Sequence, residues 1–249
     1  MSEISKNYSL ITLGWKSVEN LRSVITTAIS STIRPYEIII VINPYNGEIQ
    51  ERILSFIRQV PQLLQENGIL FKGASLTHNV GVGPAWNLAM CMASQDNLIV
   101  INDDCKVANN VFEKMVNKLN ENPLNGMVGV EWGGKPEEDF GPTPKGFLIG
   151  LRKEMLNKIG MFRESHAPFA DERELGLRAL VNNWNCVIAE GCSYHHVCDF
   201  SSNIEIPIPY LENTIIPVEF MAKIESRQQA IINNHNKILN SRKTSGNLI

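Results

Sequence analysis

The sequence predicts an α/β protein whose mainly parallel central sheet is covered by helices on both faces. Between residues 8 and 120, short apolar runs alternate with segments in which apolar residues recur at helical spacing. This alternation is typical of right-handed βαβ units. Residues 37–42 are almost entirely β-branched, as expected for a parallel strand buried on both faces. We therefore expect a three-layer α/β/α sandwich.

The first half of the chain contains four expected strands separated by helices. Ser17 can cap the first helix, because a serine side chain accepts a hydrogen bond from a backbone N–H of the first turn. Pro35 breaks the helical pattern before the second strand. The expected strands are 8–13, 37–42, 69–74 and 97–101, and the expected helices follow Ser17, carry the apolar residues of 49–60, and span 84–92.

The alternation is less regular after residue 120. A segment rich in glycine, proline and acidic residues, 133–144, predicts a loop. Three prolines between residues 207 and 217 precede a polar amphipathic helix expected at 218–239. The other expected strands are 127–132, 147–151 and 186–189, and the other expected helices are 111–119, 152–158 and 170–182.

Composition and charge exclude several classes of function. The net charge of −3 provides no basic field for phosphates, so a nucleic-acid polymer is not an expected partner. The five cysteines lack a CxxC pair, which argues against a disulfide framework or structural zinc and fits a reducing cytosol. No stretch approaches the roughly 18 apolar residues of a membrane span, and the first residues lack a signal-peptide core. We expect a cytoplasmic protein whose membrane contact, if any, is peripheral.

An acidic pair, Asp103 and Asp104, directly follows the strand expected at 97–101. Oxygen ligands held at a rigid strand end suit a hard divalent cation such as Mn²⁺ or Mg²⁺. The same residues are common in solvated turns for purely local reasons. The pair alone therefore leaves both a metal site and a simple turn open.

Two later polar clusters also have alternative interpretations. Asp171 and Glu172 open an expected helix, where the helix dipole favours carboxylates, but such a carboxylate could also accept a proton from an acceptor hydroxyl. His195 and His196 are either partly buried hydrogen-bonding residues or a source of one further metal ligand. The glycines at 81 and 83 lack the spacing of a dinucleotide fingerprint.

Taken in order and spacing, these segments resemble the family 2 glycosyltransferases of the GT-A fold. His195 or His196 falls where that family often carries a late metal-binding histidine. The resemblance extends from residue 8 to about residue 196. The similar segments are 10–16 (first strand and Pro-Thr-Tyr-Asn turn), 35–43 (Pro-x-Glu-Ile-Ile-Val-Val-Asp-Asp), 79–87 (Asn-x-Gly through Ala-Arg-Asn), 101–104 (Leu-Asp-x-Asp), 146–162 (Gly, Phe, Arg and Gly-x-Phe) and 171–178 (Glu-Asp-x-Asp-Leu-x-x-Arg).

The resemblance implies a GT-A domain of residues 1–205, with a donor-binding half (1–105) and an acceptor and catalytic half (106–205), followed by an extension (206–249) with one helix. It implies metal-assisted, inverting transfer from a nucleoside-diphosphate sugar to a hydroxyl of a glycan or glycolipid. Glu172 is the implied general base, with Asp171 as the alternative. The implied metal ligands are Asp104 with His196 or His195, and the implied nucleotide-sugar contacts are Gly14, Trp15, Asn43, Asn79, Asn87 and Asp103.

The chain departs from the family pattern at several of these positions. Ile42 and Asn43 stand where the family has two acids, and Asn102 replaces the first aspartate of the metal motif. Trp86 replaces an arginine, so a bidentate phosphate donor is lost. In the acidic motif the aspartate and the glutamate are exchanged.

These departures leave open a non-catalytic relative that keeps the fold as a binding or assembly module. A sugar-nucleotide nucleotidyltransferase would also use an α/β sheet and a metal, but residues 11–17 contain a single glycine where a glycine-rich phosphate loop would be expected. The C-terminal helix has no counterpart in the shared core. It is a candidate for contact with the acceptor, a membrane surface or a second subunit of a homo-oligomer.

Overall fold

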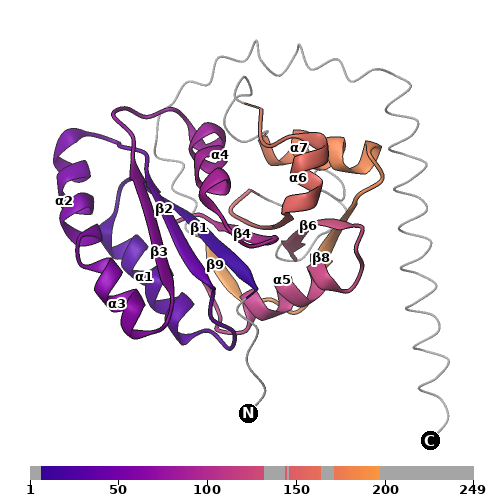
Figure 1. The fold of residues 1–249 in the computed structure, drawn as a ribbon, viewed down its shortest axis with the longest axis horizontal. Coiled ribbons are helices and arrows are strands. Elements are labelled where there is room, and N and C mark those ends of the chain that lie inside the picture. The colour runs from indigo at the N-terminus through magenta and orange to yellow at the C-terminus, as the bar shows by residue number, and fades with distance from the viewer. Residues whose placement is uncertain (1–6, 132–143, 145, 164–170, 197–249) are drawn as a thin grey trace, which may run out of the picture.

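The computed structural model describes residues 7–131, 144, 146–163 and 171–196 (Figure 1). Apart from Pro144, the loop expected at 133–144 lies outside the described residues, as does the C-terminal extension with its expected helix. Within the described part of the chain, no helix combines the length and the apolar character needed to cross a membrane.

Seven strands form one sheet in the order β3-β2-β1-β4-β7-β6-β8. Strand β7 is antiparallel to β4 and to β6, and the other neighbouring pairs are parallel. The expected α/β class with a mainly parallel sheet is therefore confirmed. The strands are β1 (Tyr8–Gly14), β2 (Glu37–Ile42), β3 (Leu70–Ser75), β4 (Asn97–Ile101), β6 (Asn125–Val130), β7 (Leu148–Arg152) and β8 (Asn185–Ala189).

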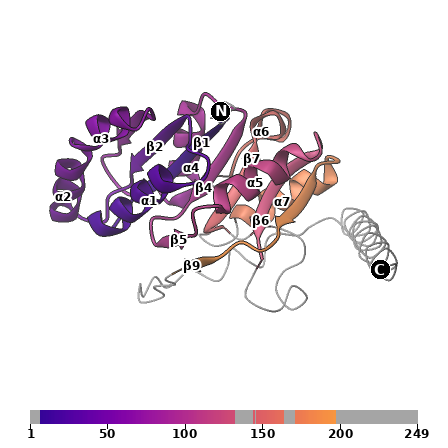
Figure 2. The ribbon, with the colours of Figure 1, turned by 90° about the horizontal axis from the view of Figure 1, so that it is seen from below.

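A second, two-stranded sheet lies outside the main one. Strand β5 (Cys105–Val107) follows β4 almost at once, and it pairs in antiparallel fashion with β9 (Tyr194–His196). Figure 2 shows the two strands side by side, although they are far apart in the sequence. Neither strand was expected from the sequence, because a three-residue strand is too short to show a periodic pattern.

Helices cover both faces of the main sheet, which confirms the three-layer sandwich. One apolar cluster contains buried residues of α1, α2, α3 and α5, and a second contains buried residues of α4, α6 and α7 (Figure 1). Neighbouring strand residues enter different clusters, as for Leu10 and Ile11, because successive side chains of a strand point to opposite faces. The helices are α1 (Val18–Ser30), α2 (Gly47–Ile57), α3 (Val60–Glu66), α4 (Val82–Met92), α5 (Val111–Asn120), α6 (Lys153–Ile159) and α7 (Asp171–Val181).

One helix expected from the sequence is wrong. The apolar residues of 49–60 were assigned to a single helix, but the chain forms α2 and then a separate helix, α3, that begins at Val60. Pro61 lies in the first turn of α3, where its missing N–H leaves no hydrogen bond unmade. The same proline could not continue α2, because its ring clashes with the preceding turn.

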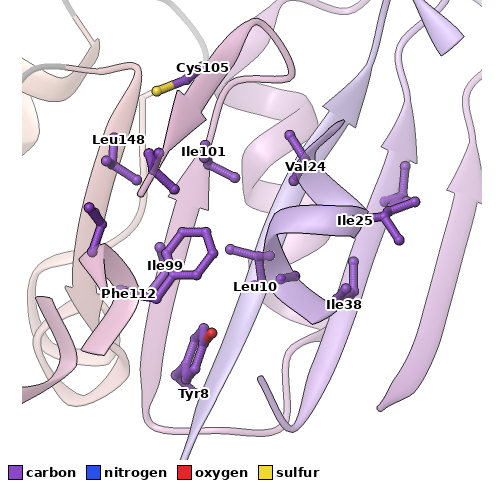
Figure 3. Packing of buried hydrophobic residues seen from close by; sticks show 14 of the residues in the cluster. Tyr8, Leu10, Val24, Ile25, Ile38, Ile99, Ile101, Cys105, Phe112 and Leu148 are labelled. Atoms are coloured by element: carbon purple, nitrogen blue, oxygen red, sulfur yellow. The ribbon is translucent and has the colours of Figure 1, made fainter. Parts of the chain in front are cut away.

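The larger apolar cluster fixes α1 and α5 against the sheet (Figure 3). Tyr8 and Phe112 are fully buried, and their ring centroids are 6.0 Å apart. The Tyr8 hydroxyl donates a 3.1 Å hydrogen bond to the carbonyl of Ile33, so its polar end is satisfied inside the core.

A buried carboxylate ties together the amino-terminal ends of the central strands. Glu37, the first residue of β2, has no exposed surface; it accepts hydrogen bonds from the Ser9 hydroxyl (2.6 Å) and the Ser94 backbone N–H (2.6 Å). Lys72 of β3 forms an ion pair with it at 2.7 Å. Burial alone would raise the pKa of Glu37, but the hydrogen bonds from Lys72, Ser9 and Ser94 outweigh this and lower the pKa below its ordinary value. This network was not expected from the sequence, because its members lie far apart along the chain.

We predict that Glu37→Gln lowers the free energy of unfolding by about 2–3 kcal/mol, because Lys72 loses its charge partner and the remaining hydrogen bonds weaken. Since the pKa of Glu37 is lower in the folded than in the unfolded protein, its stabilisation is present above the unfolded-state pKa and is lost as the pH falls through the folded-state value. Urea unfolding should therefore show a difference between wild type and variant that shrinks from neutral pH to about pH 3. Glu51→Gln, at an exposed position, is the control. A pH-independent difference would contradict the assignment.

Candidate functional site

The carboxyl ends of β1, β2 and β4 meet at one edge of the sheet, and the polar residues predicted from the sequence follow them. The Asn43 backbone N–H donates to the carbonyl of Gly14 (2.9 Å), which joins the segments after β2 and β1. The Asn102 N–H donates to the carbonyl of Phe147 (2.8 Å). Because β7 runs in the opposite direction, the residues that precede it reach the same edge.

The turn after β4 brings one histidine to the acidic pair. In the β5–β9 ladder, Cys105 lies opposite His196 and Lys106 lies opposite His195. The His196 Nε2 atom lies 3.2 Å from Asp104 Oδ1. The structure therefore brings Asp104 and His196 together, as predicted, whereas His195 is exposed and lies opposite Lys106.

The acidic pair is electrostatically strained. The pKa of Asp103 is raised to about 7, mainly by burial and then by the charge of Asp104, while a hydrogen bond from the Trp15 backbone opposes the shift. Among the described residues, Asp103 Oδ2 is buried and accepts no hydrogen bond, whereas the buried Asp104 Oδ1 has the His196 Nε2 atom beside it. A buried carboxylate oxygen without a donor favours a cation beside it.

The geometry of Asp104 and His196 fits two neighbouring ligands of a divalent cation. Ligands at right angles, each about 2.1 Å from an octahedral ion, are about 3 Å apart, close to the observed 3.2 Å. No group of three or more His, Cys, Asp or Glu side chains that could bind a metal occurs in residues 7–131, 146–163 or 171–196. Asp104 and His196 would thus fill only part of a coordination shell, and a bound ligand or water would complete it.

The Glu172 carboxylate lies against Gly146, the residue that precedes Phe147. A Cβ atom placed on Gly146 would lie 2.9 Å from Glu172 Oε2, so the carboxylate rests directly against the glycine. The next residue, Phe147, stacks on the His196 ring with centroids 4.5 Å apart and an interplanar angle of 16°. Glu172 and His196 therefore contact the two successive residues of a single dipeptide. For Asp171, only its backbone position at the start of α7 is described.

An aromatic pair and a lysine flank the edge on the β1 and β2 side. The Trp15 and Tyr45 rings meet edge to face, with centroids 5.8 Å apart. The Lys16 Nζ atom lies 4.0 Å from the Trp15 centroid and 4.9 Å from that of Tyr45. Tyr45 is 54% exposed, so its ring can receive a flat ligand by stacking. Neither Lys16 nor Tyr45 was singled out from the sequence, because isolated residues after a strand carry no motif.

Two of the asparagines predicted to contact a donor hold a loop together. The buried Asn43 amide donates to Asn79 Oδ1 and to the Gly81 carbonyl, both at 3.1 Å, and its Oδ1 accepts from the Val80 N–H at 3.0 Å. These bonds fix the turn that leads into α4, whose N-cap residue, Gly81, has a φ of 89°. Donor contact by Asn43 and Asn79 stays a prediction, and their described partners lie within the protein.

Gly14 and Asn87 also have internal roles. A Cβ on Gly14 would lie 3.1 Å from Leu21, so its lack of a side chain permits close packing. The buried Asn87 amide exchanges two hydrogen bonds with the backbone of Phe162, at 2.8 and 3.0 Å. Trp86 is 3% exposed and packs on the Phe162 ring. Asn87 and Trp86 therefore join α4 to the segment after α6.

Comparisons with known proteins agree with this architecture. The family model described as "Glycosyl transferase family 2" matches residues 11–173. No curated protein matches the sequence significantly. A mannosyltransferase, PcManGT from Pyrobaculum calidifontis, solved with GDP-Man and Mn²⁺, is similar in structure, with a TM-score of 0.61 and 14% identity over 74% of this chain and 56% of that one.

Two further solved structures are similar. GalNAc-T7 with UDP, GalNAc and Mn²⁺ has a TM-score of 0.62 and 13% identity, over 76% of this chain and 43% of that one. S. aureus TarS 1–349 in complex with UDP-GlcNAc has a TM-score of 0.56 and 15% identity, over 77% of this chain and 58% of that one. The chain thus spans between 43% and 58% of the length of these three structures.

We predict that Asn43→Asp lowers the free energy of unfolding by about 1–3 kcal/mol. The new carboxylate cannot donate, and it would face the two oxygens that now accept from the Asn43 amide. Urea unfolding at neutral pH measures the effect. Asn46→Asp is the matched control, because Asn46 caps α2 as an acceptor and aspartate caps a helix equally well. Equal stability of Asn43→Asp and wild type would show that the loop clamp is unimportant.

Proposed function

Since the chain belongs to glycosyl transferase family 2 and has the GT-A fold, we propose that it transfers a sugar from a nucleoside-diphosphate donor to an acceptor hydroxyl. The observation that best supports this function is the grouping of Asp104, His196 and Glu172 around Gly146 and Phe147 at the carboxyl edge of the sheet. A cation site can stabilise the diphosphate leaving group of such a transfer, and a carboxylate base can accept the proton of the attacking hydroxyl.

Asp104 and His196 are the residues that would hold Mn²⁺ or Mg²⁺. A divalent cation supplies positive charge that stabilises a diphosphate leaving group. The structures of PcManGT and GalNAc-T7 described above contain Mn²⁺. The 3.2 Å approach of the His196 nitrogen to the Asp104 oxygen supports the assignment in this chain.

The donor nucleotide is proposed to bind beside Trp15 and Tyr45, next to the acidic pair. Its base would stack on the exposed Tyr45 ring, and a ribose hydroxyl would donate to Asp103, whose Oδ2 accepts no hydrogen bond within the described chain. Lys16 offers a positive charge to the phosphates at the same edge. The similar structures contain GDP-Man, UDP or UDP-GlcNAc, so the nucleobase of the donor is left to the binding panel described below.

Glu172 is the proposed general base of an inverting single displacement. The acceptor oxygen attacks the anomeric carbon, the bond from that carbon to the diphosphate oxygen breaks, and the acceptor proton passes to the Glu172 carboxylate. A glycan or glycolipid would provide the hydroxyl. The expectations of a cytoplasmic location, peripheral membrane contact and self-association through the C-terminal helix remain predictions, because the extension lies outside the described residues.

A thermal-shift panel of UDP, GDP, dTDP and CDP, with and without Mn²⁺, tests donor binding. We predict that one diphosphate raises the Tm in a metal-dependent manner, because a ligand selective for the folded state stabilises it by mass action. Asp104→Asn should remove the metal-dependent part. Asp96→Asn, an exposed position at the other end of β4, is the matched control. No shift with any nucleotide would favour the non-catalytic relative. In a separate assay with nucleoside triphosphates and a sugar phosphate, release of pyrophosphate would identify a nucleotidyltransferase.

We predict that Glu172→Gln lowers kcat by about 10²- to 10⁴-fold, the range typical for loss of a general base, and leaves Mn²⁺-dependent nucleotide binding intact. Release of nucleoside diphosphate from the donor identified in the panel measures kcat, and calorimetry measures binding. Asp171→Asn is the comparison variant. A large loss in Asp171→Asn with none in Glu172→Gln would transfer the role of base to Asp171.

A further inference from the structure

Gly146 and Phe147 lie between the two groups that the proposed reaction requires. They immediately precede β7, and the Phe147 carbonyl accepts a 2.8 Å hydrogen bond from the N–H of Asn102, the residue before the acidic pair. Gly146 touches the Glu172 carboxylate, and Phe147 touches His196. A change at Gly146 would therefore affect the Glu172 carboxylate, and a change at Phe147 would affect the His196 ring.

Gly146 provides space rather than backbone freedom. Its φ is not among the positive values found for glycines in the described chain, so the backbone itself would accept another residue. A Cβ at this position would lie 2.9 Å from Glu172 Oε2 and 3.0 Å from Glu172 Cδ, both shorter than van der Waals contact. The carboxylate thus occupies the volume that a side chain at 146 would fill.

Phe147 limits how the His196 ring can turn. The β5–β9 ladder positions the backbone of His196, and contacts of the side chain set the rotation of its imidazole about the side-chain bonds. The parallel Phe147 ring at 4.5 Å covers one face of the imidazole. Tyr194 packs on Phe147 at 5.1 Å and buttresses it. Nε2 is thereby held toward Asp104, and groups that fix a ligand histidine tune its affinity for metal.

We propose that Gly146 and Phe147 are positioning residues: Gly146 leaves the space in which the Glu172 carboxylate sits, and Phe147 holds the His196 imidazole toward Asp104. This inference rests on the proposed function for its catalytic consequences. The positions of the two side chains can also be measured without turnover.

Gly146→Ala tests the first half of the proposal. The Glu172 carboxylate is the end of a flexible side chain, so it can move away from the new methyl group without a shift of the backbone. A displacement of about 1 Å can reduce turnover by up to about 10²-fold. We expect kcat for release of UDP from UDP-GlcNAc, or of GDP from GDP-Man, to fall by about 10- to 100-fold with donor KM unchanged. Gly47→Ala is the matched control, because nothing lies within 4 Å of a Cβ there.

The effect of Gly146→Ala should depend on the length of the acid at 172. In a Glu172→Asp background the carboxylate is one methylene shorter, so adding Gly146→Ala should cause little further loss. Crystal structures of wild type and Gly146→Ala provide the readout that needs no substrate. An unmoved carboxylate, an unchanged kcat, or equal losses in both backgrounds would each overturn the role of Gly146.

Phe147→Leu tests the role proposed for Phe147. Phe162→Leu is the control, because it also removes a buried aromatic ring from the core. Both phenylalanines are buried, but Phe162 packs on Trp86 and not on His196. We expect both variants to lose Tm to a similar extent, and only Phe147→Leu to weaken Mn²⁺-dependent binding of UDP or GDP, by about 10-fold. Equal Mn²⁺ dependence in the two variants would overturn the role of Phe147. If wild type binds none of the four nucleotides of the panel with Mn²⁺, the proposed function fails. Crystal structures of wild type, Gly146→Ala and Phe147→Leu would then still decide whether the Glu172 and His196 side chains move.

Discussion

Strand β7 runs against both of its neighbours in the sheet, and the candidate site depends on that reversal. A parallel strand places its last residues at the carboxyl edge, where β4 ends in Ile101. Because β7 is antiparallel, Leu148 pairs with Ile101 and the residues before Leu148 reach the same edge. A parallel strand in that position would bring the Arg152 end there instead. The reversal thus places Gly146 and Phe147 beside the acidic pair, and through them Glu172 and His196.

The candidate site contains carboxylates that are costly to bury, and the surrounding structure holds them in place. Asp103 and Asp104 are adjacent carboxylates at a partly buried turn, and burial raises the pKa of Asp103 to about 7. The short β5–β9 ribbon, which carries His196, is held in place by hydrogen bonds to Glu131. The Tyr194 hydroxyl of β9 donates to the Glu131 carbonyl, and the N–H of Gly191, which precedes β9, donates to the Glu131 carboxylate, both at 2.8 Å. A buried carboxylate oxygen without a donor, as on Asp103, is typical of a functional site rather than of packing.

The parts of the molecule that could be predicted from the sequence are those with a periodic pattern. The β-branched run 37–42 is a strand with every residue buried, and Ser17 caps α1 as expected. Asp104 and His196 were expected together on the resemblance alone, and the three-residue strands that join them carry no periodic pattern. The partners of an amide cannot be read from a sequence either. Asn43 and Asn87 were therefore assigned to the donor, although their described hydrogen bonds go to the protein.

The departures from the family pattern have structural partners of their own. Trp86, in place of an arginine, packs on Phe162, and Asn43, in place of an acid, clamps the turn before α4. Both side chains make internal contacts, and under the proposed function donor recognition falls to Trp15, Lys16 and Tyr45. The Glu172 carboxylate separates a working transferase from a non-catalytic binding module. A cation held by Asp104 and His196 would serve a nucleotide-binding module as well as a transferase, whereas a carboxylate seated against Gly146 can accept the proton of an attacking hydroxyl, a step that binding alone does not include. The placement of Glu172 near the Asp104–His196 pair therefore favours transfer over binding alone.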